Sequence, residues 1–279
     1  MSRVPRILMC PPTYFGIEYE INPWMNRQVV ANNDLARQQW DTLHAKLIEL
    51  GATIELMEPI KGLPDIVFTA NAGLVYGDLV LASRFRHGVR QGETPHFNTW
   101  FQANGFRVET LPEKMFFEGA GDALFCGEIL FAGYRSRSDA KGAMWIGDRL
   151  GVEALPLELV DPRFYHIDTC FCPLAKSEAL YFPGAFDDYG RAVISARIGK
   201  LIAVEADEAA HFCCNAVVVG KNVILNDGAP KLAANLESAG YKVYSLPLSE
   251  FMKAGGSAKC LTLRLDGEDA LARLNQGAS

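Results

Sequence analysis

Three stretches of the chain share one pattern: a polar residue, an apolar run, a two-residue turn that contains glycine, and a second apolar run. They are Phe68–Arg84 (FTANAGLVYGDLVLASR), Phe117–Tyr134 (FEGAGDALFCGEILFAGY) and Phe212–Gly228 (FCCNAVVVGKNVILNDG). A glycine-containing dipeptide between two apolar runs is typical of a β-hairpin. The sequence therefore predicts three matched hairpins, with turns at Gly77-Asp78, Gly127-Glu128 and Gly220-Lys221.

The segments between the hairpins complete a repeating unit of about 45–55 residues. Tyr165–Pro183 is a fourth hairpin with a longer turn, and each hairpin precedes a helix-like stretch and a short strand. The N-terminal part supplies a strand at Arg6–Cys10, a helix from Asn33 and a strand from Thr53, and its missing partner strand is predicted at Lys259–Leu265. Glycines that fit the ends of the other four helices follow them, at 105, 151, 199 and 240.

Five such ββαβ units predict an α/β fold in the form of a five-bladed, pseudo-symmetric propeller that occupies residues 1–279 as one catalytic domain. A ring of blades leaves no long strand edge unprotected. The polar residue that opens each hairpin would then face a central channel. The alternative is a conventional α/β sheet with irregular loops, and the three matched hairpins favour the ring.

Composition excludes several classes of protein. Hydrophobic residues make up 49% of the 279 residues and charged residues 22%, which fits a globular core. The net charge of −6 disfavours a nucleic-acid binder. No apolar stretch reaches the length of a membrane span, and the first residues lack the apolar core of a secretory leader. These features predict a cytoplasmic protein with no membrane partner, and they leave open whether it is a homo-oligomer.

The seven cysteines do not suggest a metal site. Five of them stand in strand-like apolar runs, at 126, 170, 172, 213 and 214, where a cysteine behaves as a small hydrophobic residue. The pairs 170/172 and 213/214 lack zinc-site spacing. We therefore expect no structural metal.

A few polar residues stand where chemistry is plausible, although each alone also fits a structural role. Cys260 follows a glycine loop and is expected to open an apolar strand. His166 and Asp168 are expected to share one face of a strand, because alternate residues do so. Glu118 is an acid at the start of an apolar hairpin and suggests a pocket wall. Arg90 and Arg137 each follow a hairpin, and two such arginines could clamp one carboxylate through bidentate hydrogen bonds.

In combination, the pieces FTANAG, FEGAGD, HID, the two arginine loops and GGSAKC resemble the guanidino-group-modifying superfamily. This superfamily includes arginine deiminases, dimethylarginine dimethylaminohydrolases, amidinotransferases and arginine dihydrolases. The resemblance covers nearly the whole chain and implies the five-bladed fold known as the pentein. It casts Cys260 as nucleophile, His166 as general acid and base, Glu118 and Asp168 as the carboxylates on the guanidinium, and Arg90 and Arg137 as binders of the substrate carboxylate. The implied partner is a small guanidino substrate, arginine or a methylated arginine, and the implied chemistry needs no metal or organic cofactor.

Two departures resemble the arginine dihydrolase branch, which converts arginine to ornithine, carbon dioxide and ammonia. Ala70-Asn71 replaces the acidic residue of deiminases and dimethylaminohydrolases, and Glu118-GAG-Asp122 is one residue longer than the deiminase motif. Asn71 can both donate and accept hydrogen bonds, so it could hold the neutral ureido group of citrulline for a second hydrolysis. Asn22, in the N-terminal loop, is a further substrate-binding candidate.

Other activities remain as alternatives. A dimethylargininase or a deiminase would stop at citrulline, and an amidinotransferase is a third possibility. The same propeller also occurs in a non-enzymatic ribosome anti-association factor. That binding protein has no need for Glu118, His166 and Cys260 at one channel, which favours an enzyme.

Overall fold

The computed structural model describes residues 4–267; residues 1–3 and 268–279, which the single-domain prediction also includes, lie outside the described residues. Within this range the strands form five three-stranded sheets. The first sheet contains β15 (Leu263–Arg264), β1 (Arg6–Met9) and β2 (Thr53–Leu56). The others contain β3 (Gly73–Tyr76), β4 (Leu79–Ala82) and β5 (Arg107–Thr110); β6 (Ala123–Cys126), β7 (Ile129–Tyr134) and β8 (Ala154–Glu158); β9 (Phe171–Ala175), β10 (Glu178–Tyr181) and β11 (Lys200–Ala203); and β12 (Val217–Val219), β13 (Asn222–Asn226) and β14 (Lys242–Leu246).

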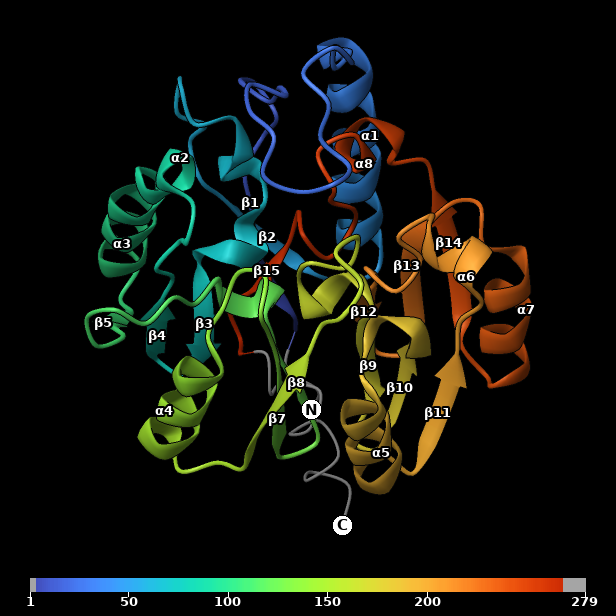
Figure 1. Ribbon diagram of the computed structural model, residues 1–279. Helices are drawn as coiled ribbons and strands as arrows, with labels where there is room; N and C mark the ends of the chain where they lie inside the picture. The colour runs from blue at the N-terminus through green and yellow to red at the C-terminus, as the bar shows by residue number, and fades with distance from the viewer. Residues whose placement is uncertain (1–3, 268–279) are drawn as a thin grey trace.

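Every sheet has the same connectivity. The first two strands pair antiparallel, and the second and third pair parallel. A parallel pair needs a crossover, and one helix supplies it in each unit. These helices are α1 (Asn33–Glu49), α3 (Glu93–Ala103), α4 (Ala140–Leu150), α5 (Asp188–Arg197) and α7 (Pro230–Ser238). Figure 1 shows the five units around a common centre with these helices on the outside, which confirms the predicted five-bladed α/β propeller.

Short helices complete the fold. The α-helical ones are α2 (Gly88–Gln91), α6 (Ala206–Ala209) and α8 (Ser249–Met252). The 3₁₀ turns are η1 (Pro64–Val67), η2 (Thr69–Ala72), η3 (Gly119–Gly121), η4 (Ile167–Thr169) and η5 (Pro183–Ala185). In the described part of the chain, no helix has the length and apolar character needed to cross a bilayer.

The first blade is assembled from the two distant parts of the chain. Ile7 and Leu8 of β1 lie opposite Arg264 and Leu263 of β15 in an antiparallel pair. The predicted partner strand in the 259–265 segment is therefore confirmed, although only Leu263–Arg264 is extended. This pair takes the place that a hairpin fills in the other four blades.

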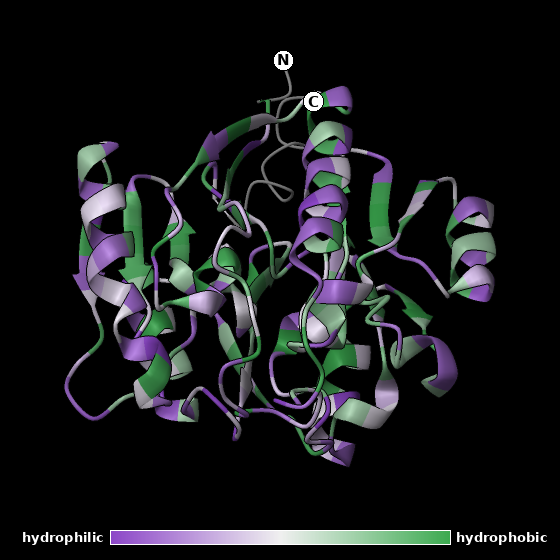
Figure 2. Cartoon of the chain, turned by 90° about the horizontal axis from the view of Figure 1, so that it is seen from above, coloured by the Kyte–Doolittle hydropathy of each residue, from purple (hydrophilic) through white to green (hydrophobic). Residues whose placement is uncertain are grey.

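Burial explains why the inner strands read as continuous apolar runs. All residues of β6, β12 and β15 are buried, because these strands face the centre on one side and the neighbouring layer on the other. The third strands of the first two blades, β2 and β5, have exposed ends. In Figure 2, apolar colouring follows the strands, whereas the helices carry both polar and apolar colouring.

Helix ends follow the sequence signals, with one exception. The side chain of Asn32 caps α1 by accepting a hydrogen bond from the Leu35 amide at 3.0 Å. Gly105, Gly151 and Gly240 have the positive φ angles expected after a helix. Gly199 does not; α5 ends in extended backbone at Ile198, and the Gly199 amide donates to Ser177 Oγ instead.

Candidate functional site

The candidate site lies where the chain enters the inner strands of the five blades. Each of these entry segments contributes a buried polar side chain from a turn, at Asn71, Glu118, His166, Asn215 and Cys260. The turns η2 and η3 contact each other, as do η3 and η4. The polar residues therefore meet near the centre of the ring, as the repeat pattern predicts. In residues 4–267, no group of three or more His, Cys, Asp or Glu side chains has the arrangement of a metal site.

The Glu118 carboxylate contacts three other groups of the site. One carboxylate oxygen, Oε2, lies 2.9 Å from Arg137 Nη1 and 2.8 Å from His166 Nε2. The other, Oε1, accepts from the Arg86 amide at 3.2 Å. Burial alone would raise the pKa of Glu118, but Arg137 and His166 outweigh it and hold this pKa far below its usual range. Glu118 is therefore a carboxylate at neutral pH, the form that can grip a cation.

His166 is neutral in this arrangement. Burial lowers its pKa to about 4, and the hydrogen bond and charge of Glu118 only partly oppose the effect. A carboxylate can only accept, so the 2.8 Å contact places the imidazole proton on Nε2. A neutral imidazole close to a carboxylate can accept a proton during a reaction and return it.

Asp122 is connected to Glu118 through the hydroxyl of Ser138. Its Oδ2 accepts from Ser138 Oγ at 2.6 Å, and that hydroxyl also accepts from the Glu118 amide at 3.0 Å. Burial and the nearby charges of Glu118 and Asp168 raise the pKa of Asp122 well above its usual range. In the sequence, Asp122 is the polar residue directly before the apolar run of its hairpin, and no role was predicted for it.

Cys260 lies beside the second candidate carboxylate. Its Sγ is 3.3 Å from Asp168 Oδ2, and the geometry is that of a thiol donating to a carboxylate. Burial and the Asp168 charge raise the pKa of the Cys260 thiol well above its usual value. Without a cation in the site, Cys260 is therefore a neutral thiol. A bound guanidinium would offset the Asp168 charge and favour the thiolate.

Asn71 has an amide orientation that its neighbours determine. Arg90 Nη1 lies 3.0 Å from Asn71 Oδ1, and a guanidinium can only donate. The Asn71 nitrogen therefore points away from Arg90, and it donates to the carbonyl oxygen of Glu118 at 3.1 Å. A side chain at Gly121 would collide with this amide, which explains a glycine in the FEGAGD segment. Among residues 4–267, the Asn71 nitrogen has no second hydrogen-bond partner, so its other hydrogen could donate to a ligand.

Arg90 is held by acids that the sequence did not point to. Its Nε and Nη2 bind the two Glu93 oxygens, each at 2.8 Å, and Nη2 also donates to the Asp65 carbonyl at 3.3 Å. The Asp65 carboxylate is 3.8 Å away. With one N–H of Nη1 given to Asn71, a single N–H is left for a substrate. In this arrangement Arg90 could therefore offer a substrate carboxylate at most one N–H group.

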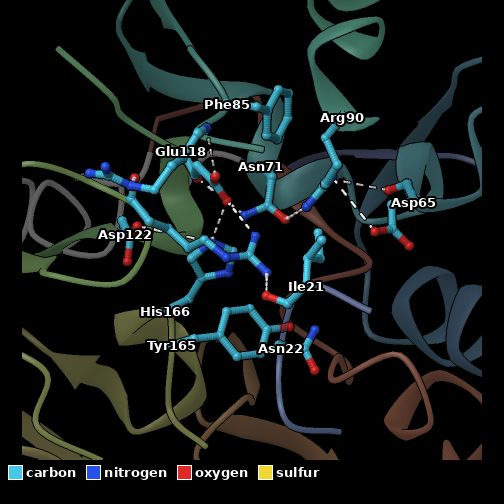
Figure 3. Close-up of polar contacts among 12 residues, drawn as sticks. Ile21, Asn22, Asp65, Asn71, Phe85, Arg90, Glu118, Asp122, Tyr165 and His166 are labelled. Atoms are coloured by element: carbon cyan, nitrogen blue, oxygen red, sulfur yellow. Dashed lines mark hydrogen bonds and ion pairs between the residues drawn. The ribbon is translucent and has the colours of Figure 1, made fainter. Parts of the chain in front are cut away.

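Arg137 and Asn22 connect the site to the N-terminal loop. Arg137 Nη2 donates to the Ile21 carbonyl at 3.0 Å, and its guanidinium lies 4.6 Å from the ring centre of Tyr165. Asn22 donates to the Ala254 carbonyl and accepts from the Trp24 amide, so its side chain joins this loop to the glycine loop before Cys260. Figure 3 shows Asn22 beside Tyr165, and it also shows Glu118 and Ile21, the two residues to which Arg137 donates.

Two expectations about local structure are wrong. His166 and Asp168 do not lie on a strand; Ile167–Thr169 forms the turn η4, and β9 starts only at Phe171. Cys260 also lies in a turn, three residues before β15. In both places a turn precedes the strand. The turn lets the polar side chain reach the centre of the ring, and the apolar residues that follow enter the core.

Several residues of the site were missed by sequence reasoning. The sequence does not single out Glu93 and Asp65, because they look like ordinary acidic residues of a helix and a loop. Asn215 could have been found, because it stands at the same hairpin position as Asn71 and Asp122. Its side chain is fully buried, and its Nδ2 lies 3.1 Å from Cys260 Sγ.

Known proteins match the chain along nearly its whole length. Residues 11–266 match the family described as "N,N dimethylarginine dimethylhydrolase, eukaryotic". The bifunctional arginine dihydrolase/ornithine cyclodeaminase ArgZ of Synechocystis is 50% identical over 265 residues, which are 93% of this chain and 37% of ArgZ. A dimethylarginine dimethylaminohydrolase of Mycobacterium tuberculosis is 40% identical over 94% of this chain and 86% of its own length. The chain thus spans less than two fifths of ArgZ but most of the mycobacterial protein.

A solved structure agrees with the fold. The crystal structure of the N-terminal domain of ArgZ, a cysteine-to-serine mutant bound to substrate, superposes with a TM-score of 0.91 at 49% identity. The match covers 94% of this chain and 98% of that domain.

Proposed function

Because the chain belongs to the N,N-dimethylarginine dimethylhydrolase family, within the guanidino-group-modifying superfamily, we propose that it is an arginine dihydrolase. It would convert arginine and two water molecules to ornithine, carbon dioxide and two ammonia molecules. The observation that carries this proposal is the fixed amide of Asn71. Arg90 and the Glu118 carbonyl orient it so that an N–H donor faces the site where an acidic residue would offer only acceptors. The match to ArgZ covers 93% of this chain, and ArgZ is described as a bifunctional arginine dihydrolase, which supports the same activity.

The charges of the site suit a substrate with a cation at one end and an anion at the other. The arginine guanidinium would take the place of Arg137 on Glu118 and would also neutralise Asp168 beside Cys260. Arg137, released from Glu118, would bind the substrate carboxylate. A bound cationic substrate would thereby lower the pKa of the Cys260 thiol. Without such a substrate the thiol would stay neutral, which would protect it from side reactions.

The chemistry then uses side chains of this chain alone. The Cys260 thiolate adds to the guanidinium carbon, and the electrons of the broken C=N π bond move to nitrogen. His166, carrying the proton that the thiol gave up, protonates the departing nitrogen, and ammonia leaves an S-alkylthiouronium. His166 next takes a proton from water as its oxygen adds to carbon, and the C–S bond breaks to return the thiolate and citrulline.

Citrulline would undergo a second cycle in the same site. Its ureido oxygen accepts from the Asn71 amide, Cys260 attacks the ureido carbon, and the second ammonia leaves. Hydrolysis of the resulting thioester-like adduct releases a carbamate, which decomposes to ornithine and carbon dioxide. A first-step enzyme would instead let citrulline escape.

Dimethylarginine hydrolysis is the second candidate, and the family match and the mycobacterial relative favour it. Incubation with arginine, citrulline and dimethylarginine in separate reactions distinguishes the candidates. We expect ornithine and ammonia from arginine. A product pool that stops at citrulline, or dimethylamine released from dimethylarginine much faster than ammonia from arginine, would overturn the dihydrolase assignment.

A further inference from the structure

Asn215 is the side chain in closest polar contact with the candidate nucleophile. It stands two residues before β12, and its side chain is fully buried. Its Nδ2 lies 3.1 Å from Cys260 Sγ and 3.1 Å from the Asp168 carbonyl oxygen. Its Oδ1 lies 3.1 Å from the Cys260 amide nitrogen. A single side chain therefore contacts both the backbone and the sulfur of Cys260.

The orientation of the Asn215 amide follows from these partners. The Cys260 amide can only donate, so the atom facing it must be the oxygen. The Asp168 carbonyl can only accept, so the atom facing it must be the nitrogen. The second N–H of the same nitrogen is then directed at Sγ. In addition, the Asn215 carbonyl accepts from the Lys259 amide at 3.1 Å, which fixes the turn that presents the cysteine.

We propose that Asn215 is a catalytic residue that stabilises the Cys260 thiolate by donating a hydrogen bond to its sulfur. The contact acts twice in each hydrolysis: when the thiolate attacks carbon, and when it departs as the C–S bond breaks. The proposal rests on the proposed function in taking Cys260 as the nucleophile. Burial and Asp168, the acidic group next to Sγ, raise the pKa of the Cys260 thiol, and two hydrogen bonds oppose them: one from the Ser257 backbone and one from the Asn215 side chain.

Three neighbouring side chains do not donate to Sγ, and the other hydrogen bond that lowers the pKa of the Cys260 thiol comes from the backbone of Ser257. The Tyr165 hydroxyl donates to the Gly255 carbonyl at 2.6 Å. The His166 Nε2 proton is directed at Glu118. The Asp168 carboxylate accepts and repels a thiolate. Asn215 is thus the one side chain in the described contacts that donates to Sγ.

The test uses Asn215→Asp, which keeps an oxygen for the Cys260 amide and replaces the donor to Sγ with an acceptor. Iodoacetamide alkylation of Cys260 is followed by mass spectrometry across pH without substrate, so that the thiol itself is measured. We expect the alkylation rate near pH 8 to fall at least about ten-fold and its pH midpoint to rise by at least about one unit. We also expect kcat for arginine to fall about 100-fold with a much smaller change in KM.

Asn226→Asp is the matched control. Asn226 is equally buried, donates to the His211 and Asp227 carbonyls, accepts from the Leu248 amide and lies 3.0 Å from Met252 Sδ, a sulfur that never ionises. It should leave the alkylation of Cys260 unchanged. If Asn215→Asp does not fold, Asn215→Ser, whose hydroxyl is too short to span the gap, carries the same expectation.

An alkylation profile in the folded Asn215 variant that matches the parent would overturn the proposal. A different result would overturn the proposed function. In that case the parent would release no ammonia from arginine, whatever the alkylation of Cys260 shows.

Discussion

Arg137 and Glu118 form a buried ion pair in which Nη1 lies 2.9 Å from Oε2, and neither side chain is more than 2% exposed. The acid proposed to bind the substrate guanidinium is thus already occupied by a guanidinium of the protein. Under the proposed function, substrate binding would exchange one cation for another, and the charge of Glu118 would be compensated in both states. The ring tolerates a buried carboxylate for this reason.

Glu118→Gln should destabilise the fold as well as abolish turnover. The substitution leaves Arg137 buried without its counter-charge, which costs about 3–5 kcal/mol. Asp41→Asn is a suitable control, because its ion pair with Arg37 is exposed and should contribute less than about 1 kcal/mol. Urea denaturation of the three proteins gives the free energies of unfolding; equal values for both variants would contradict the role assigned to the buried pair.

The two arginines should respond differently to loss of the substrate carboxylate. Arg137→Ala should weaken arginine binding by roughly 2–5 kcal/mol more than agmatine binding, because agmatine has no carboxylate. Arg90→Ala should affect both substrates about equally, because its hydrogen bonds go to Glu93 and Asn71. Steady-state KM values on the two substrates check this. A strong preference change in Arg90→Ala alone would restore the clamp expected at that residue.

His166 should contribute to the loss of stability in mild acid. Its pKa of about 4 in the fold is below the ordinary 6.5, so the unfolded chain binds the proton more tightly and stability falls as pH falls below about 6.5. Between pH 7.5 and 5.5 this amounts to about 1 kcal/mol, and His166→Phe should lack it. Glu93, whose pKa is raised to about 7, has the opposite pH dependence but titrates in both proteins. Parallel stability curves for parent and variant would refute the neutral histidine.

Cys260→Ser should abolish turnover and keep the fold, because an alcohol is far less ionised than a thiol near neutral pH. Ammonia release and circular dichroism measure the two properties. Activity that survives in the variant would show that Cys260 is not the nucleophile, and Cys213 and Cys214 would be the next candidates.

Asn71→Asp should separate the two hydrolyses. A carboxylate keeps the contact with Arg90 but loses the donor to the Glu118 carbonyl and to the ureido oxygen of citrulline. Such a loss costs on the order of 1–3 kcal/mol, more when the repelled group is charged. The cationic guanidinium is affected less, so the variant should release citrulline where the parent releases ornithine. Chromatography of the products shows which occurs; continued ornithine formation at the parent rate would exclude this role for Asn71.

The sequence alone could predict the ring because its hairpins carry local signals. Gly77, Gly127 and Gly220 all have φ near 60°, as a tight turn requires, and the apolar runs match strands buried on both sides. The missing strand of the first blade could also be inferred, because the N-terminal unit lacks one strand that the other four units have. The predicted meeting of the hairpin-opening residues at the centre followed from that symmetry.

Contacts between distant residues could not be predicted in this way. The Asn215 amide faces Cys260 across 45 positions of sequence, and only the folded ring shows that it contacts the sulfur. The acids that hold Arg90 were hidden because a buried Glu93 and an exposed one look alike in sequence. Gly199 had the correct spacing for a helix end, but Ser177 holds its backbone in another conformation.

The pairing of β1 with β15 has a consequence for the order of events during synthesis. The ring closes only when the strand at Leu263–Arg264 reaches Arg6–Met9, and Cys260 lies three residues before that strand. On a ribosome, the four blades that contain hairpins have therefore emerged before the proposed nucleophile is available to join them. A chain that stops short of closure carries the acids and the histidine but no cysteine among them. Enzyme activity in this architecture is thus a direct report that the ring has closed.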